Sequence, residues 1–286
     1  MTTQLKDALR EVLVDWQSDL SSNWRSIVDE VELAFDDVDE TLELHPWEPI
    51  FPSRRHFFLP GEPEGAHMLH AFDGLPPEAV RCVLIGQDPY PNIAFCTGRA
   101  VESGEHRSWR ELDNMRSRSM RCLIQSVYAF RSGRVSHTLE VEGWPATLEA
   151  ITALENGFPT PAELAQSWVD QGVLLLNASL TLTRFAVDGD PHQTCGHLPL
   201  WRPLMAHLLR YFANRSGQPV VFLLFGHAAQ SVANASGIVD GTSVHRHPAI
   251  VVSPHPAEGN RFLEGSNPFV SCNSKLLAMD AAPIHW

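Results

Sequence analysis

The stretch "VLIGQDPYPNIAFCTGRAV", residues 83–101, runs from an apolar segment into a polar bend. The apolar segment is short, rich in aliphatic residues and ends at Gly86, which is typical of a strand buried on both faces. Gln87, Asp88 and Tyr90 follow directly, with a proline on each side of the tyrosine to stiffen the bend. The stretch therefore predicts polar side chains at the carboxyl end of a buried strand.

Three more runs are similar to the first, and helical patterns separate all four. We expect strands over residues 82–85, 173–176, 220–225 and 250–252. We expect helices over residues 119–130, 161–170, 200–214 and 228–235. Unbroken aliphatic strands that alternate with helices indicate a parallel sheet with both faces covered. The expected fold class is therefore α/β, a three-layer α/β/α arrangement around a central, mostly parallel four-stranded sheet.

Polar side chains follow the other three strands as well. Asn177 follows the second strand, His227 the third and His255 the fourth. The carboxyl ends of parallel strands meet at one edge of an open α/β sheet, and ligands bind there. We therefore expect an acid, a carboxamide, a phenol and an imidazole to converge in one cleft.

The N-terminal part of the chain is expected to pack on the same unit. Residues 4–35 carry helical periodicity that breaks near Ser21, which predicts a pair of helices. Residues 45–64 hold five prolines among aromatic residues, so we expect an irregular but ordered loop. With residues 1–64 packed on the sheet, residues 1–286 are expected to form a single domain.

Composition argues against several classes of protein. No window approaches the roughly 20 apolar residues of a membrane helix, and the N-terminus lacks the order of a signal peptide, so we expect a soluble, cytoplasmic monomer. The five cysteines include no CxxC pair, which argues against a disulfide framework, a zinc ribbon or an iron–sulfur cluster. His245 and His247 form an HxH pair with no third ligand in register, so no metal is expected.

The net charge of -13 speaks against a nonspecific nucleic-acid binder, but the charge is unevenly spread. Residues 29–48 hold nine Asp or Glu and no Lys or Arg, whereas residues 99–134 hold eight Arg against four acids. We expect the acidic segment to be a solvated face turned away from nucleic acid; the alternative is a protein-binding or DNA-mimicking surface. Arginine pairs with phosphate oxygens in a bidentate fork, which favours a nucleic-acid contact for the second segment.

The residues at the sheet edge indicate water chemistry. Asp88 can activate water, His255 can donate to a leaving group, and Asn177 can read an amide-like edge. The sequence has no GxSxG elbow and no GxxxxGKS phosphate loop. The pattern therefore favours addition of water at a centre beside a planar, amide-bearing leaving group.

Four motifs carry a resemblance to a known family. "GQDPY" at 86–90, "GVLLLNASLTLT" at 172–183, "VVFLLFGHAAQ" at 220–230 and "SPHPA" at 253–257 resemble the successive motifs of the family 1 uracil-DNA glycosylases. Trp201 after His197 and "NPFVSCNSKLL" at 267–277 are further matches. The resemblance covers most of residues 24–280.

The resemblance implies a monofunctional enzyme that flips a nucleotide out of DNA and hydrolyses its N-glycosidic bond, leaving an abasic site. Carried over by position, Asp88 would orient the water and favour the sugar cation, and His255 would stabilise the anionic base oxygen. Asn177 would read the Watson–Crick edge of the base, Gln87 would line the pocket through its backbone, and Tyr90 would lie against C5. No metal or organic cofactor is implied.

The base pocket departs from the family pattern. Val101 aligns with the aromatic residue that stacks on uracil, and Phe95 is the ring that could substitute for it. The expected substrate is uracil or a 5-modified pyrimidine, for example the hydroxymethylated or glucosylated cytosine of phage DNA, whose removal would serve antiviral defence. Tyr90 counts against bulk at C5. The alternative function is a non-catalytic module that binds a modified base in DNA.

The elements that grip DNA also differ, because an enlarged Arg-rich insert at 102–160 replaces the family's clamping loop and the wedge is missing from "HPAEGN" at 255–260. We expect the insert to supply both phosphate contacts and a wedge. The expected DNA contacts are Trp109, Arg107, Arg110, Arg116, Arg118, Ser119, His197 and Arg261. The alternative is an amphipathic helix with a solvated basic face.

Five other tryptophans are expected in the hydrophobic core: Trp24, Trp47, Trp144, Trp168 and Trp201.

Overall fold

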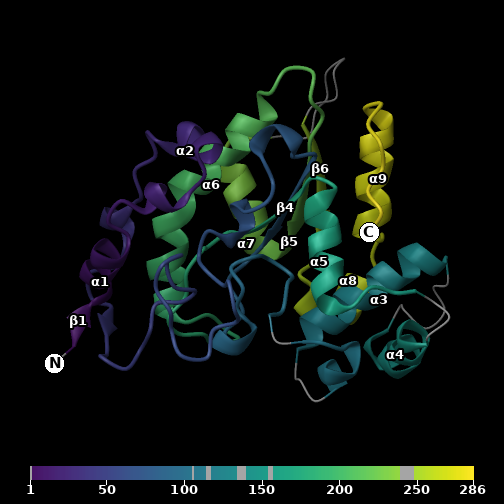
Figure 1. Cartoon of the computed structure of the whole chain (residues 1–286), viewed down its shortest axis with the longest axis horizontal. Coiled ribbons are helices and arrows are strands. Elements are labelled where there is room, and N and C mark those ends of the chain that lie inside the picture. Colours follow the sequence, from purple (N-terminus) through teal and green to yellow (C-terminus); the bar gives the residue numbers. More distant parts are fainter. Residues whose placement is uncertain (1, 105, 114–116, 134–139, 154–156, 239–247) are drawn as a thin grey trace.

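The computed structural model describes residues 2–104, 106–113, 117–133, 140–153, 157–238 and 248–286 (Figure 1). Two sequence predictions lie outside the described residues. One is the DNA contact of Arg116, and the other is the HxH pair of His245 and His247.

The centre of the molecule is a four-stranded parallel sheet. Its strands are β3 (Cys82–Gly86), β4 (Val173–Asn177), β5 (Val221–Phe225) and β6 (Ala249–Ser253), in the order β4-β3-β5-β6. Every residue of β3, β4 and β5 is buried, as their unbroken aliphatic sequences require. The register pairs Gly86 with Asn177 and Phe225 with Ser253, so that the carboxyl ends of neighbouring strands are level. The predicted strands agree with these bounds to within one residue.

Helices cover both faces of the sheet, and Figure 1 shows α6 and α7 beside one face and α5 and α9 beside the other. The helices are α1 (Leu5–Val12), α2 (Ser22–Val28), α3 (Arg118–Ser132), α4 (Trp144–Thr152), α5 (Pro161–Asp170), α6 (Leu198–Ala213), α7 (Gly226–Ala235), α8 (Asn260–Leu263) and α9 (Pro268–Ala278). The predicted three-layer α/β/α fold is confirmed. No described helix is long and apolar enough to cross a membrane.

The helix boundaries follow from local chemistry. Thr160 caps the start of α5, since its side chain and that of Glu163 form a reciprocal capping box, and Pro161 is the first residue of the helix. α3 ends at Gly133, which adopts a φ of 66° that favours glycine. The four predicted central helices lie within two residues of the observed bounds. The predicted N-terminal pair is also present, although its second helix ends at Val28 instead of running on to residue 35.

One contiguous core joins the N-terminal helices to the sheet and to the last residue of the chain. It extends from Leu5 to Trp286. Four of the five tryptophans predicted in the core are buried: Trp24, Trp144, Trp168 and Trp201. The prediction for Trp47 is wrong, because its side chain is 75% exposed and stacks on His45 in a surface turn, with the ring centroids 4.5 Å apart.

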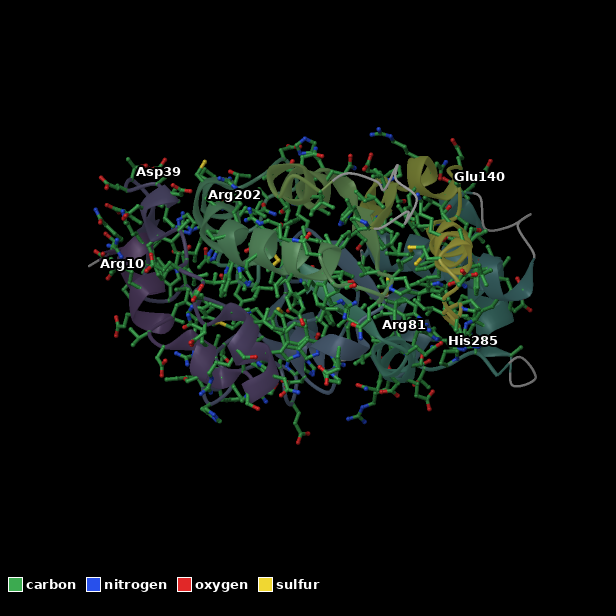
Figure 2. The ribbon with its side chains drawn as sticks, turned by 90° about the horizontal axis from the view of Figure 1, so that it is seen from above. Arg10, Asp39, Arg81, Glu140, Arg202 and His285 are labelled. Atoms are coloured by element: carbon green, nitrogen blue, oxygen red, sulfur yellow. The ribbon has the colours of Figure 1, made fainter. Side chains whose placement is uncertain are left out.

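The acidic segment lies at one end of the molecule, where Figure 2 labels Asp39 and Arg10. Glu140, from the insert, is labelled at the other end. Part of the acidic charge is compensated locally, since Asp36 pairs with Arg10 at 3.1 Å and with Lys6 at 3.2 Å. Asp39 of the acidic segment and Glu140 of the insert therefore lie at opposite ends of the molecule.

Candidate active site

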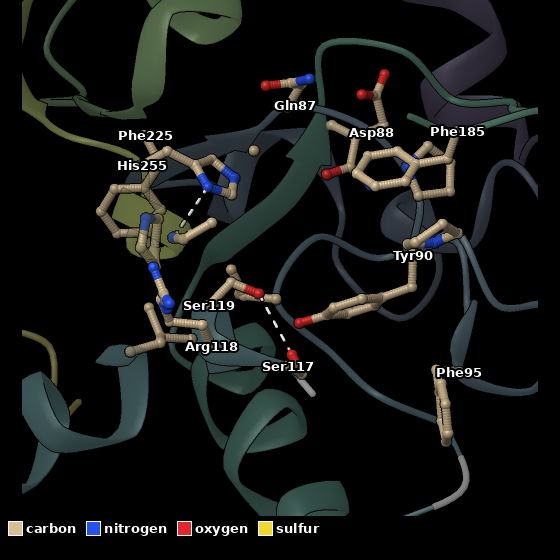
Figure 3. Close-up of a pocket in the computed structure, with 18 of the residues that line it drawn as sticks. Gln87, Asp88, Tyr90, Phe95, Ser117, Arg118, Ser119, Phe185, Phe225 and His255 are labelled. Carbon is tan, nitrogen blue, oxygen red and sulfur yellow. Dashed lines mark hydrogen bonds between the residues drawn. The ribbon is translucent and has the colours of Figure 1, made fainter. Parts of the chain in front are cut away.

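A cavity of about 520 Å³ opens at the carboxyl edge of the sheet. All four strands contribute to it: Gln87 and Asp88 follow β3, Asn177 ends β4, Phe225 ends β5 and His255 follows β6 (Figure 3). The residues expected to converge thus line one cavity, because the level ends of parallel strands bring them to one edge. His227 does not line the cavity; it lies exposed on α7.

Asp88 is held in the cavity by a residue far away in the sequence. The Nε2 amide of Gln193 donates a hydrogen bond to Oδ2 of Asp88. Oδ1 is buried and has no hydrogen-bond partner within the described part of the chain. Burial raises the pKa of Asp88 to about 6, and hydrogen bonding from Gln193 and Gln87 opposes that rise. Asp88 is therefore a carboxylate at neutral pH, and one of its oxygens has no hydrogen-bond donor among the described residues.

His255 is positioned as a neutral hydrogen-bond donor. Its Nδ1 accepts a hydrogen bond from the backbone N–H of Ala257 at 3.1 Å, so the neutral ring carries its proton on Nε2. Its backbone N–H donates to Glu258 Oε1 at 2.8 Å, which fixes the start of the turn. Burial lowers the pKa of His255. The imidazole is thus uncharged at neutral pH and presents one N–H.

Asn177 and Tyr90 form two further walls. Asn177 is 3% exposed, and its Oδ1 lies only 2.6 Å from the position a Cβ would take on Gly86. Tyr90 is hydrogen-bonded to Ser119 near the start of α3, and burial raises its pKa. Figure 3 shows the Tyr90 hydroxyl directed toward Ser117 and Ser119. Ser119, predicted to contact DNA, therefore lines the cavity beneath Tyr90.

Val101 and Phe95 line the part of the cavity wall where the resemblance predicts an aromatic ring that stacks on the base. Val101 lines the cavity with a φ of 57°, a left-handed conformation that β-branched residues rarely adopt. Phe95 also lines the cavity, but its ring stacks on His106, with centroids 5.0 Å apart and planes 13° apart. One face of the Phe95 ring is therefore occupied.

Comparison with known proteins identifies the family. The chain is 31% identical over 254 residues to the uracil-DNA glycosylase of Lacticaseibacillus casei (strain BL23), covering 84% of this chain and 90% of that protein. It is 30% identical over 227 residues to the uracil-DNA glycosylase of Exiguobacterium sibiricum, covering 78% and 83%. The chain belongs to the uracil-DNA glycosylase family. It is thus a DNA glycosylase, an enzyme class that hydrolyses N-glycosidic bonds.

Solved structures share the fold of this glycosylase. The wild-type UNG from Nitratifractor salsuginis superposes with a TM-score of 0.61 at 24% identity and covers 98% of both chains. The mimivirus uracil-DNA glycosylase superposes with a TM-score of 0.61 at 15% identity, covering 100% of this chain and 94% of that one. No protein-family model matches the sequence.

Two predicted DNA contacts of the glycosylase are wrong, because their side chains are buried. Trp109 is 5% exposed, and its Nε1 donates to the carbonyl of Pro159 at 2.7 Å. His197 is fully buried and hydrogen-bonded to Thr181 at 2.8 Å and Thr183 at 3.1 Å. Burial lowers the pKa of His197 to about 3, so it stays neutral. Neither residue can reach a duplex.

Apart from Ser119, the other predicted DNA contacts that the structure describes are exposed arginines. Arg118 lies on the rim of the glycosylase cavity. Arg107 and Arg110 are exposed in the insert, and Arg110 donates to Thr152 Oγ1 at 2.9 Å. Arg261 pairs with Glu258 at 2.6 Å. These side chains can reach solvent and phosphate, so their DNA contact stays a prediction.

Sequence reasoning missed Gln193, which lies behind Asp88, and several residues that line the cavity, among them Phe185 and Val187. Gln193 holds Asp88, and Phe185 and Val187 line the mouth with 46% and 91% of their surfaces exposed. The two large apolar side chains in segment 183–190, flanked by charged residues, were the available signal for Phe185 and Val187. The sequence carried no signal that would have identified Gln193. Within the described residues, no group of three or more His, Cys, Asp or Glu side chains could hold a metal ion.

Proposed function

We propose that this glycosylase flips a uracil or a 5-modified pyrimidine out of DNA and hydrolyses its N-glycosidic bond, leaving an abasic site. The observation that carries the proposal is the pairing of a buried carboxylate with a neutral N–H donor in one cavity. Figure 3 shows Asp88 and His255 on opposite sides of that cavity. Asn177 ends β4, the strand beside the one that Asp88 follows, and offers one donor and one acceptor to the edge of a base.

The electrostatics of the pair favour a dissociative reaction. The bond between the sugar C1′ and the base nitrogen breaks, and its electron pair leaves with the base. The N–H of His255 donates to the base oxygen that gains the negative charge. Water then forms the new bond to C1′ and passes its proton to the Asp88 carboxylate.

The burial of Asp88 also favours the dissociative transition state. A carboxylate whose pKa is raised to about 6 by burial is poorly stabilised in the free enzyme. It gains a favourable partner only when positive charge develops on the sugar. Interactions that strengthen in the transition state are the ones that accelerate the chemical step.

The size of the cavity supports the 5-modified pyrimidine as a substrate. A volume of about 520 Å³ lies in the range that accommodates drug-sized ligands, which are larger than a pyrimidine ring. Val101 stands where the family has a ring, which leaves room beside the base. We propose that hydroxymethylated or glucosylated cytosine of phage DNA enters this space, and that the enzyme then acts in antiviral defence. The relatives are named uracil-DNA glycosylases, which favours uracil, so the released base must be identified directly.

The DNA is proposed to lie over the mouth of the cavity. Arg107, Arg110 and Arg118 would contact phosphates there. Phe185 and Val187 replace Trp109 as the candidates for the wedge, because apolar side chains at the mouth can fill the stack that a flipped base vacates. The contiguous core from one end of the chain to the other supports a single domain, which we propose acts as a monomer.

The test is the identity of the released base. The full chain is incubated with uracil-containing DNA, unmodified DNA and phage-derived hypermodified DNA, and free bases are identified by mass spectrometry. We expect release from uracil-containing or hypermodified DNA and none from unmodified DNA, with Asp88→Asn inactive. Release of uracil alone would contradict the modified base. DNA binding without release from any substrate would establish the alternative, a non-catalytic modified-base module.

A further inference from the structure

Gln193 lies 1% exposed beside the catalytic carboxylate, on a π-helical turn over His192–His197. Turns of this kind are rare and frequent at functional sites. We infer that Gln193 is a positioning residue that holds one oxygen of Asp88 and leaves the other to orient the attacking water. The inference rests on the proposed function for the reaction, and on the contacts below for the geometry.

The orientation of the Gln193 amide is set by its own turn. Its Oε1 accepts from the backbone N–H of Asp190 at 3.4 Å, so the Nε2 end faces Asp88. The backbone N–H of Gln193 donates to the carbonyl of Asp190 at 3.0 Å. The Asp190 side chain accepts from His192 N at 2.8 Å, which fixes the turn before the glutamine. The donor is therefore aimed before any substrate arrives.

Buried histidines anchor this turn to the end of β4. His192 Nδ1 bonds to Thr183 Oγ1 at 2.9 Å, and His197 bonds to Thr181 and Thr183. Trp201 Nε1 donates to Thr181 Oγ1 at 2.8 Å, which completes the network. The buried His197, excluded as a DNA contact, thus helps to fix the turn that carries Gln193.

The hydrogen bond from Gln193 engages one carboxylate oxygen of Asp88 and leaves the other without a partner among the residues that the structure describes. Oδ2 receives the amide hydrogen, while Oδ1 is buried and without a partner in the described part of the chain. Gln87 also acts on the carboxylate, but no hydrogen bond of ordinary geometry from it reaches Oδ1. Neither glutamine is charged, and no charged side chain is among the causes that shift Asp88. Loss of the Gln193 amide would therefore weaken both the ionisation and the orientation of Asp88.

The test that does not depend on activity is the titration of Asp88 in the full chain, followed by ¹³C NMR of its carboxyl group and assigned with Asp88→Asn. Gln193→Met has a similar length and no amide, and we expect it to raise the pKa of Asp88 by about one to two units. Gln193→Glu should raise it further, because two carboxyl groups then share one site. Gln17→Met is the matched control, since it removes a side-chain hydrogen bond to Val31 at 3.3 Å outside the cavity.

The kinetic readout is base release as a function of pH. The acid limb should move to higher pH in the order Gln, Met, Glu at position 193, and kcat should fall about 10- to 100-fold with little change in KM. If the Met variant does not fold, Gln193→Asn, whose amide is one methylene short, should shift the limb in the same direction. An unshifted pKa and pH profile in every variant overturns the inference. A wild-type chain that releases no base refutes the proposed function, while the NMR titration still decides the role of Gln193.

Discussion

The Cβ that Gly226 lacks would lie 2.8 Å from the Cβ of His255. Gly226 adopts a φ of 78° at the start of α7, and the absence of its side chain lets the turn after β6 approach β5 closely. The position of the His255 imidazole thus depends on a glycine in another strand connection.

Gly226→Ala should therefore displace His255. We expect base release to fall about 100-fold, because a shift of about 1 Å in a catalytic group has that effect. The measurement is single-turnover base release with a thermal melt in parallel. Gly237→Ala is the control, since its φ of 70° imposes similar backbone strain but its Cβ would meet nothing within 4 Å. Equal activity losses in both variants would show that the close approach of position 226 to His255 does not matter for base release.

Base release should show an acid limb and no basic limb near neutrality. Asp88 must be ionised, and its pKa of about 6 means that activity falls about tenfold per pH unit below that value. His255 acts as a neutral donor with a lowered pKa, so it does not need to hold a second proton. Measurement of kcat/KM from pH 4.5 to 8.5 tests this. A decline above pH 6.5 would indicate that a charged imidazole is required.

Asp88→Asn should inactivate the enzyme and stabilise its fold. The folded-state pKa of Asp88 is raised from 3.8 to about 6, so folded protein loses stability as pH rises through this window. The asparagine does not ionise, and we expect the variant to be about 2 to 3 kcal/mol more stable at pH 8, with the difference vanishing near pH 4. Denaturant unfolding at the two pH values measures it.

Asp73→Asn is the contrasting control for this effect. His67 at 2.8 Å and Arg55 stabilise the Asp73 carboxylate and lower its pKa to about 2 against the effect of burial. The stability contributed by Asp73 is therefore present above pH 4 and lost as pH falls toward 2. Its replacement should destabilise the fold at pH 8. If Asp88→Asn also destabilises the fold at pH 8, the raised pKa of Asp88 is contradicted.

Val101→Phe should narrow the substrate range. A ring at the cavity wall fills the space proposed for the substituent at C5 and offers a stacking face worth roughly 1 to 3 kcal/mol. We expect release of a hypermodified base to be lost and release of uracil to be retained or increased. Competition assays with mixed substrates, read out by mass spectrometry, measure the ratio of hypermodified base to uracil released. An unchanged ratio would place the specificity elsewhere in the pocket.

Phe185→Ala with Val187→Ala should weaken action on duplex more than on single-stranded DNA. Only the duplex has a stack to be filled when a base leaves it, so a fall of about tenfold is expected for duplex alone. Val14→Ala is the matched control, because Val14 is 67% exposed and does not line the cavity. Equal losses on both substrates would remove these residues from the wedge role.

Local sequence predicted the elements of this protein well. The helical pattern over residues 161–170 predicted a helix with the observed bounds, and the aliphatic runs predicted strands correct to within one residue. Asp88, Asn177 and His255 were placed together without any contact information, since parallel strands bring their carboxyl ends to one edge.

The sequence by itself thus determined the sheet, its covered faces and the chemistry at its edge, because strand burial and parallel topology follow from short-range patterns. Only the tertiary structure decided which side chains are buried and which of them hold the Asp88 carboxylate. Trp109 is buried by partners 50 residues away, and Gln193 meets Asp88 across 105 residues. Burial and long-range hydrogen bonds depend on what the folded chain brings alongside a residue, and neighbours in the sequence do not record it.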